Sequence, residues 1–196
     1  MKKIILHLLI FLIVIFFSSC LTYRNDNKKY HAILLTAQKE LSQTLNKIPT
    51  GQEELYGFNS KSEIENAEIG KPFEFYTLED EELKRTSSYR VPVLVADEFR
   101  ALATIEIIND TLHIVDFGAT MLAKEIQTAC NENSTMNFVG ILRIYSLFSD
   151  YVIMSKKQEY FLIPLTSAKI YLKTIGISNP ENYYSKNQIL NLIKTK

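Results

Sequence analysis

The sequence has no tryptophan, and its 196 residues include only two cysteines, three histidines and six glycines. Isolated histidines and cysteines cannot form the CxxC or HxxxH pairs that place two metal ligands on one face. Gly57 and Gly70 do not form a phosphate-binding loop. The sequence therefore predicts neither a metal site nor a bound cofactor or nucleotide.

Neither sign of charge is in excess, because 22 lysines and arginines balance 22 aspartates and glutamates. The lysines occur as scattered pairs, such as Lys28-Lys29 and Lys156-Lys157. A nucleic-acid partner would need clustered basic residues that neutralise phosphates. The sequence predicts no such partner.

A long apolar run occurs only at the N-terminus, from Ile4 to Phe17, after Lys2 and Lys3 and before Ser18-Ser19-Cys20. A positive end, a short apolar segment and small residues, in this order, are typical of an export signal. The run has roughly 14 residues, fewer than the ~20 that span a hydrocarbon core, so a retained transmembrane helix is the weaker interpretation.

The stretch Phe17-Ser18-Ser19-Cys20 resembles the bacterial lipobox, and its serine-rich form is similar to that of Bacteroidota lipoproteins, although Phe17 replaces the usual aliphatic residue. The resemblance implies cleavage before Cys20, a diacylglycerol on its thiol and acylation of its new amino group. Leu21 is not the aspartate that retains enterobacterial lipoproteins at the inner membrane. We therefore expect a cell-envelope protein held on the membrane by lipidated Cys20, at the outer rather than the inner membrane.

Residues 1–19 are thus predicted to be a lipoprotein signal peptide, residues 20–29 a polar tether and residues 30–196 a single α+β domain. The 177 residues left after cleavage are enough for one domain with a core. Once Cys20 is lipidated, Cys130 has no partner for an intramolecular disulfide. Its neighbours Ile126 and Ala129 predict that its thiol is buried.

Helices are predicted where apolar residues recur every three or four positions. Ser60 and Glu63 fit a capping box that opens a second helix at 61–69. Others are predicted at Ala119 to Cys130 and at Asn182 to Ile193. The first helix begins at Tyr30, ends before Pro49 and has its apolar positions at Ile33, Leu34, Ala37, Leu41, Leu45 and Ile48.

Strand-like segments separated by polar turns occupy most of the remaining chain, with turns near Asp97 and at Asn109-Asp110. Short connections and absent βαβ crossovers favour a mainly antiparallel sheet of about six or seven strands with helices packed on a face. This α+β order is similar to PAS-like, profilin-like and cystatin-like arrangements. Ile107 and Ile126 are assigned to the core. The predicted strands are Phe73 to Tyr76, Val91 to Val95, Ala101 to Ile108, Leu112 to Phe117, Phe138 to Phe148, Tyr151 to Met154 and Tyr160 to Leu165.

Two sequence features match fragments of catalytic or metal sites. Asp116-Phe117-Gly118 matches the kinase metal-binding tripeptide, but the chain has neither a glycine-rich phosphate loop nor a His-Arg-Asp loop. The tripeptide is therefore interpreted as the end of a strand. The acidic run from Glu79 to Glu82 lacks the ligand pattern of a calcium loop and is interpreted as a solvated loop.

A thiol enzyme is an alternative that would use Cys130 as nucleophile with a histidine as base. His31 and His113 remain after cleavage, and His113 lies near Asp116 on a predicted strand. The spacing does not favour this triad over a core thiol and a strand histidine.

Tyrosines are frequent in the C-terminal half, and their apolar rings with polar tips suit binding to proteins or glycans. Asp110-Thr111-Leu112 is similar to the Asp-Thr-aliphatic acceptor for O-glycosylation in Bacteroidota, which implies a glycan on Thr111. The tyrosines concerned are Tyr145, Tyr151, Tyr160, Tyr171, Tyr183 and Tyr184.

The sequence favours a lipid-anchored, non-enzymatic envelope protein that binds a protein or glycan partner. The segment from Tyr145 to Ser155, with residues 161–165, resembles the propeptide and inhibitor strands of streptopain-type cysteine proteases, which implies a protease-inhibitor or propeptide-like module as a further alternative. The segment Tyr56 to Pro72, with Arg90 to Val93, resembles an uncharacterised bacterial envelope family. This resemblance implies no activity for the chain.

Overall fold

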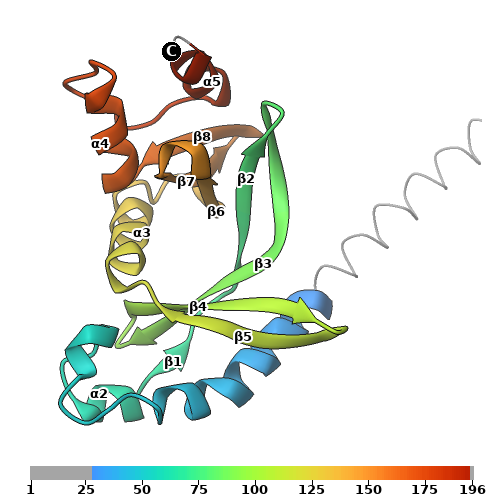
Figure 1. Cartoon of the computed structure of the whole chain (residues 1–196), viewed down its shortest axis with the longest axis vertical. Helices are drawn as coiled ribbons and strands as arrows, with labels where there is room; N and C mark the ends of the chain where they lie inside the picture. The colour runs from blue at the N-terminus through green and yellow to red at the C-terminus, as the bar shows by residue number, and fades with distance from the viewer. Residues whose placement is uncertain (1–27, 195–196) are drawn as a thin grey trace, which may run out of the picture.

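The computed structural model describes residues 28–194, which form a strongly twisted sheet with helices on both of its faces (Figure 1). A helix at residues 28–45, here called the N-terminal helix, comes first. None of the helices in residues 28–194 is long and apolar enough to cross a membrane. The following elements are η1 (Glu53–Tyr56), α2 (Lys61–Glu65), β1 (Glu68–Ile69), β2 (Phe73–Glu79), β3 (Glu82–Val95), β4 (Glu98–Ile108), β5 (Thr111–Gly118), α3 (Thr120–Glu132), β6 (Asn137–Ile144), η2 (Tyr145–Leu147), β7 (Ser149–Lys156), β8 (Glu159–Pro164), α4 (Thr166–Thr174) and α5 (Lys186–Lys194).

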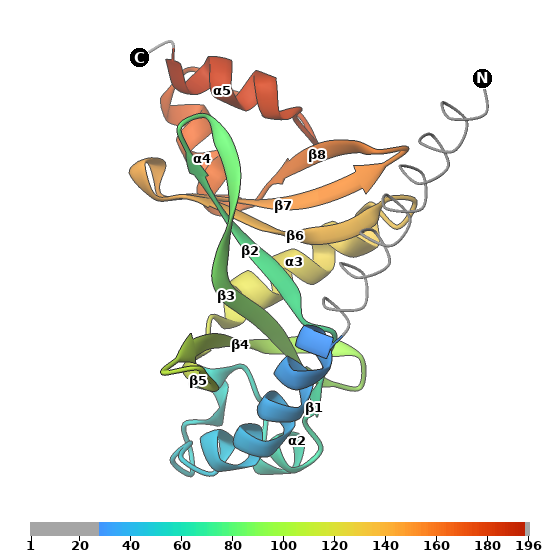
Figure 2. The ribbon, with the colours of Figure 1, turned by 90° about the vertical axis from the view of Figure 1, so that its right-hand side faces the viewer.

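The sheet has the strand order β5-β4-β3-β2-β6-β7-β8, with β1 paired to β3. Every pair is antiparallel except β2 with β6, which is parallel. This parallel pair joins two antiparallel halves, β1 to β5 and β6 to β8. The long β2–β3 hairpin belongs to the first half, and its strand β2 borders β6 of the second (Figure 2).

Helices cover both faces of the sheet because both faces of its strands are apolar. Leu102 on β4 and Ile141 on β6 pack in one cluster with Ile126 of α3. Their neighbours Ala103 and Leu142 point to the other face, since side chains alternate along a strand. There Ala103 packs with the N-terminal helix and Leu142 with α4 and α5.

Four hairpins close through two-residue turns in which both residues have positive φ. The pairs are Asp80-Glu81, Ala96-Asp97, Asn109-Asp110 and Lys157-Gln158. Such turns match the twist of the strands that they join. The predicted turns near Asp97 and at Asn109-Asp110 are confirmed.

The predicted α+β class with a mainly antiparallel sheet is confirmed, and the sheet has eight strands. Ile107, however, was wrongly assigned to the core, because 47 % of its surface is exposed, whereas Ile126 is fully buried. Ile107 lies near the end of β4, beyond the buried residues Ala101 to Ile105.

Several boundaries differ from those predicted. The second helix ends at Glu65 and is followed by β1, and the last helix begins at Lys186 rather than at Asn182. Lys28 and Lys29, assigned to the tether, are helical. The predicted strand from Phe138 to Phe148 ends at Ile144, and α4 was not predicted at all.

Candidate binding groove

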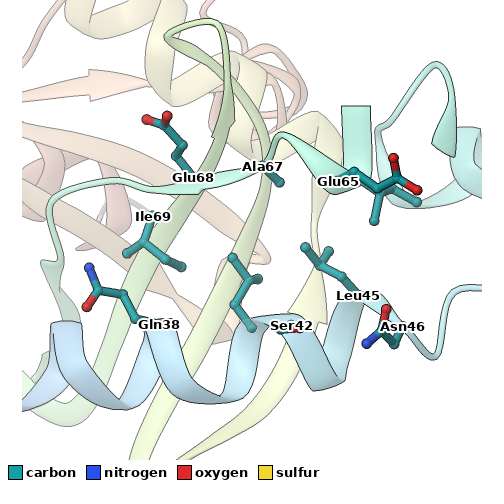
Figure 3. Close-up of a pocket in the computed structure, with 10 residues that line it drawn as sticks. Gln38, Ser42, Leu45, Asn46, Glu65, Ala67, Glu68 and Ile69 are labelled. Atoms are coloured by element: carbon teal, nitrogen blue, oxygen red, sulfur yellow. The ribbon is translucent and has the colours of Figure 1, made fainter. Parts of the chain in front are cut away.

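A groove of about 610 Å³ separates the N-terminal helix from the segment that contains α2 and β1 (Figure 3). The helix contributes one wall and residues 64–69 contribute the other. The two walls are close in sequence, but the groove exists only because the helix packs on the sheet beside β1. We call this feature the α2–β1 groove.

The helical wall has an apolar base and a polar rim. Leu41 and Leu45 are almost completely buried against Val93 and Ala101 of the sheet. The rim of this wall is formed by three exposed residues that also line the groove. They follow one another at intervals of four positions: Gln38, Ser42 and Asn46. Residues at this spacing lie on one face of a helix, so three hydrogen-bonding side chains border the groove along its length.

The opposite wall is also apolar, but its rim is negatively charged. Ile64, Ala67 and Ile69 are partly buried in the same cluster as Leu45. Glu65 and Glu68 are exposed, line the groove and form no ion pair with any residue in 28–194. No lysine or arginine of the described part of the chain lines the groove to balance them.

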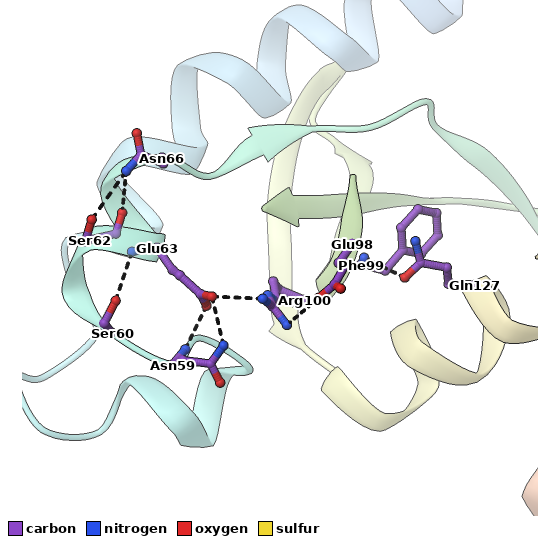
Figure 4. Close-up of polar contacts among 9 residues, drawn as sticks. All are labelled: Asn59, Ser60, Ser62, Glu63, Asn66, Glu98, Phe99, Arg100 and Gln127. Carbon is purple, nitrogen blue, oxygen red and sulfur yellow. Dashed lines mark hydrogen bonds and ion pairs between the residues drawn. The ribbon is translucent and has the colours of Figure 1, made fainter. Parts of the chain in front are cut away.

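The wall at α2 is held in place by Glu63, as Figure 4 shows. The Ser60 hydroxyl accepts a hydrogen bond from the Glu63 N–H at 3.3 Å, which confirms the N-cap half of the predicted capping box. The Glu63 carboxylate accepts bonds from the backbone and side-chain nitrogens of Asn59, each at 2.8 Å. A five-residue helix is marginal by itself, so these bonds are needed to fix its start.

Arg100 connects this helix start to the sheet. Its guanidinium contacts Glu63 at 2.8 Å and Glu98 at 3.0 Å, and its side chain is only 15 % exposed. The hydrogen bonds from Asn59, with a further contribution from Arg100, lower the pKa of Glu63 below its ordinary value of 4.5. The groove wall is therefore stabilised by a charged carboxylate.

Replacing Glu63 with Ala should lower the free energy of unfolding by about 1 to 2 kcal/mol at pH 7, because the carboxylate that accepts two hydrogen bonds from Asn59 is lost and Arg100 loses one of its two carboxylates. Since the pKa of Glu63 is lowered in the folded state, its contribution is present above pH 4.5 and disappears as the pH falls through the lowered pKa. Urea unfolding at pH 7 and pH 3 measures the difference. Glu65→Ala is the matched control, because it removes an exposed carboxylate and should change stability by about 0.5 kcal/mol or less at either pH. An equal effect of both substitutions would contradict the assigned role of Glu63.

Among the described residues, the polar side chains that line the groove are two amides, one hydroxyl and two carboxylates. Its lining includes one hydroxyl, that of Ser42, and neither histidine nor cysteine. Across residues 28–194, no group of three or more histidine, cysteine, aspartate or glutamate residues is placed to hold a metal ion.

Of the two predicted modification sites, Cys20 and Thr111, the structure describes only Thr111. Cys20 lies outside the described residues. Thr111 is exposed at the predicted β4–β5 turn, and its hydroxyl donates to the carbonyl of Ile108 at 2.8 Å. It also contacts Nε2 of His113 at 2.8 Å. The position is accessible, and its glycosylation stays a prediction.

The residues of the predicted thiol triad each have a different environment in the structure. Cys130 packs against the cluster under α3. His113, on the edge strand β5, contacts Glu40 of the N-terminal helix through Nδ1 at 3.3 Å. Asp116 is paired with Arg90 at 3.5 Å. The structure does not bring these groups together.

Burial raises the pKa of the Cys130 thiol to about 11, away from the range in which a thiol is nucleophilic at neutral pH. In a Cys20→Ala variant, iodoacetamide should therefore label Cys130 about 100-fold more slowly in the folded protein at pH 8 than after denaturation, from the difference in thiolate fraction alone. Mass spectrometry of the timed reaction measures both rates. Similar rates before and after denaturation would restore the thiol-enzyme alternative.

The kinase-like tripeptide and the acidic run both have structural roles. Asp116-Phe117-Gly118 ends β5, where Gly118 with φ 134° leads into α3. The acidic run forms the β2–β3 turn, and lysines of α5 bind it: Lys186 contacts Glu82 at 2.9 Å and Lys194 contacts Glu81 at 2.7 Å. These carboxylates hold the C-terminal helix to the hairpin.

The tyrosines of the C-terminal half divide into buried and exposed groups. Tyr151 and Tyr184 belong to the core, whereas Tyr145, Tyr160 and Tyr183 are exposed. Near Tyr145, Phe148 is 87 % exposed and has φ 49°. A bulky residue rarely adopts this left-handed conformation. The sequence analysis did not single out Phe148, since its strain and exposure are properties of the folded loop.

Comparisons with known proteins identify no relative of this chain. No family model, no curated protein and no solved structure matches it. The candidate site therefore depends on geometry and chemistry alone.

Proposed function

We propose that the protein is a lipid-anchored protein of the cell envelope, attached through Cys20 and located at the outer rather than the inner membrane. It acts as a non-enzymatic binding module, whose partner is a protein segment that enters the α2–β1 groove. The observation that supports the binding role is the groove itself, with an apolar base and an acidic rim beside the sheet. The anchor is inferred from the sequence around Cys20.

The chemistry of the groove specifies the partner's side chains. Apolar groups would fill the space above Leu41, Leu45 and Ile64, where removing apolar area from water favours binding. Lysine or arginine would pair with Glu65 and Glu68, which are free of competing cations among the described residues. The proposed partner is therefore a segment that carries both apolar and basic residues.

Photo-crosslinking in intact cells tests this proposal. A photoreactive amino acid placed at Ser42, on the groove rim, should capture a reproducible partner. The same amino acid at Ile170, which is 59 % exposed on α4, is the matched control and should not capture it. Mass spectrometry of the crosslinked peptide identifies the partner segment.

Charge reversal distinguishes a specific partner from an adventitious neighbour. The double substitution Glu65→Lys and Glu68→Lys should reduce capture at Ser42 by about tenfold, because a basic segment then meets like charge. A synthetic peptide of the captured segment should compete. Undiminished capture by the double variant, or a captured segment without basic residues, would refute the proposed binding mode.

The anchor has its own test, because Cys20→Ala should move the protein from the membrane to the soluble fraction. A lipid of two or three chains is the proposed means of attachment, and Cys20 precedes the folded domain. Fractionation and intact mass measure location and lipid together. Cys130→Ala should stay on the membrane as the control, whereas a membrane-bound Cys20→Ala variant would mean that the apolar N-terminal run is a retained anchor.

A second candidate function, glycan binding, is supported by the exposed aromatic rings of Tyr145 and Phe148. The Arg143 guanidinium lies 5.9 Å from the Tyr145 ring centroid and is held at 2.7 Å by the nearly buried Asp150. Aromatic faces beside an oriented guanidinium suit a sugar with an acidic substituent.

On a glycan array, Phe148→Gly should lose binding while remaining folded, since glycine relieves the positive φ. Unchanged binding would exclude this surface.

A further inference from the structure

A second depression, also of about 610 Å³, lies where the link between β1 and β2 passes Tyr30 of the N-terminal helix. It is distinct from the α2–β1 groove, because the two share no lining residue. Tyr30 of the helix, Phe73 of β2 and Phe138 of β6 line it. The first described turn of the helix lies beside the beginning of β2 (Figure 2).

The lining of this depression is mostly hydrocarbon and aromatic. Phe73 and Phe138 meet edge to face with ring centroids 5.0 Å apart. Leu94 and Phe99 add partly buried apolar surface. The N–H of Phe99 donates to Gln127 of α3 at 2.9 Å, so this side of the depression is fixed to a helix.

Among residues 28–194, Lys71 is the only charged residue that lines the depression. Its side chain is exposed and forms no ion pair within residues 28–194. It stands between Gly70 and the buried Pro72, at the edge of the apolar surface. An apolar cavity with one cation at its edge is complementary to an apolar chain that ends in an anion.

We propose that this depression binds a single fatty acyl chain with an anionic head group, whose charge pairs with Lys71. The volume lies in the range of roughly 300 to 1,000 Å³ that small-molecule sites occupy, and such sites are mainly apolar with a few polar groups that orient the ligand. Aromatic and aliphatic walls accept the chain without specific hydrogen bonds. The head group supplies the orientation.

The depression lies close enough to the proposed anchor for membrane lipid to reach it. The supply of lipid is the only part of this proposal that depends on the anchor. Tyr30 is ten residues beyond Cys20, so the chain between them extends at most about 35 Å. The depression of the anchored protein is therefore within reach of the bilayer surface. The binding chemistry itself does not need the anchor.

Photolabelling of the full-length protein in phosphatidylcholine nanodiscs tests the site. The probes are palmitic acid with a diazirine on its chain, the methyl ester of that acid and phosphatidylglycerol with the same diazirine chain. Peptide mapping should place the palmitate label on residues 70–73, 94–99 and 138–139. Phosphatidylglycerol labelling at the same residues would assign the bilayer as the source, and labelling by free palmitate alone would assign a free fatty acid.

Two variants make the result decisive. Leu94→Trp should fill the depression and abolish labelling, whereas Leu55→Trp, at a residue 75 % exposed on η1, should leave it unchanged. Lys71→Gln should weaken palmitate binding by about three- to fivefold and leave the uncharged methyl ester unaffected. Because Lys71 is exposed, this variant remains informative even if Leu94→Trp unfolds.

Labelling spread over the surface, or equal labelling of the acid and its ester, would overturn the proposal. The same labelling repeated on Cys20→Ala separates the two proposals. If that variant leaves the membrane but still binds palmitate, the site and the anchor are both correct. If it remains bound to membranes and the site is labelled as described, only the anchor is wrong.

Discussion

Ile126→Asp should unfold the domain, whereas Ile107→Asp should leave it folded. Ile126 is fully buried under α3, where it packs with Leu102, Ile141 and the phenylalanines of β2. Aspartate there removes the apolar contacts and introduces a carboxyl group without a partner. These two losses together amount to about 5 kcal/mol or more, which is comparable with the whole stability of a small domain.

Ile107 provides the matched control because it has the same chemistry and a different environment. Its surface is 47 % exposed near the end of β4. The cost of aspartate there is about 1 kcal/mol or less, mainly from a lower strand preference. Circular dichroism and urea unfolding of both variants measure the difference. A folded Ile126→Asp variant would show that the core beneath α3 is not continuous.

Gly140→Ala should destabilise the protein by about 3 kcal/mol, because one added methyl group would collide with the backbone. A Cβ atom at Gly140 would lie 2.3 Å from the carbonyl oxygen of Glu74. Gly140 and Glu74 are register partners in the parallel pair of β2 with β6. This pair joins the two antiparallel halves, so the substitution forces apart the one connection that makes them a single sheet.

Hydrogen exchange gives this prediction a specific signature. Amides of β2 and β6 should lose protection, while the β4–β5 hairpin, which does not border Gly140, should keep it. Gly176→Ala is the control, because a Cβ there meets no atom within 4 Å but φ is 94°. It should cost only the strain of a left-handed backbone, about 1 kcal/mol. Equal effects of the two substitutions would contradict a collision between the added methyl group and the backbone of Glu74.

Local patterns in the sequence were sufficient for many of the elements. The four-residue periodicity of Ile33, Ala37, Leu41 and Leu45 predicted the N-terminal helix, and all four are buried. The capping box at Ser60 predicted the start of α2. Periodicity and caps act within a few residues, so they can be recognised without knowledge of the fold.

Elements that depend on distant partners were missed. No side chain of its own caps α4; instead, the N–H of Thr166 donates to Glu125 of α3 at 2.9 Å. The first half of β3 is rich in polar residues, and its partners come from other strands: Arg85 pairs with Glu74 and Ser88 donates to Glu106. Such contacts span 11 to 41 positions in the chain and leave no local pattern.

The candidate sites were visible in the sequence only in part. The capping box identified Glu63, but nothing adjacent in sequence indicates that Arg100 binds it across 37 positions. The tyrosine-rich half predicted aromatic surface, yet Tyr151 is buried while Tyr145 is exposed. Neither the groove nor the depression at Lys71 corresponds to a motif, since each is bounded by elements that meet through packing.

The sequence by itself determined the α+β class, the hairpin turns at Asp97 and Asn109-Asp110 and the helix that contains Ile126, because each follows from the order of apolar, polar and turn-forming residues along the chain. The expectation of an anchor at Cys20 also depends on the sequence alone. Only the tertiary structure decided which face each helix covers, that Ile107 is exposed, and where cavities remain. Burial and cavities depend on how whole elements pack, and packing is a property of surfaces that come together from distant parts of the chain.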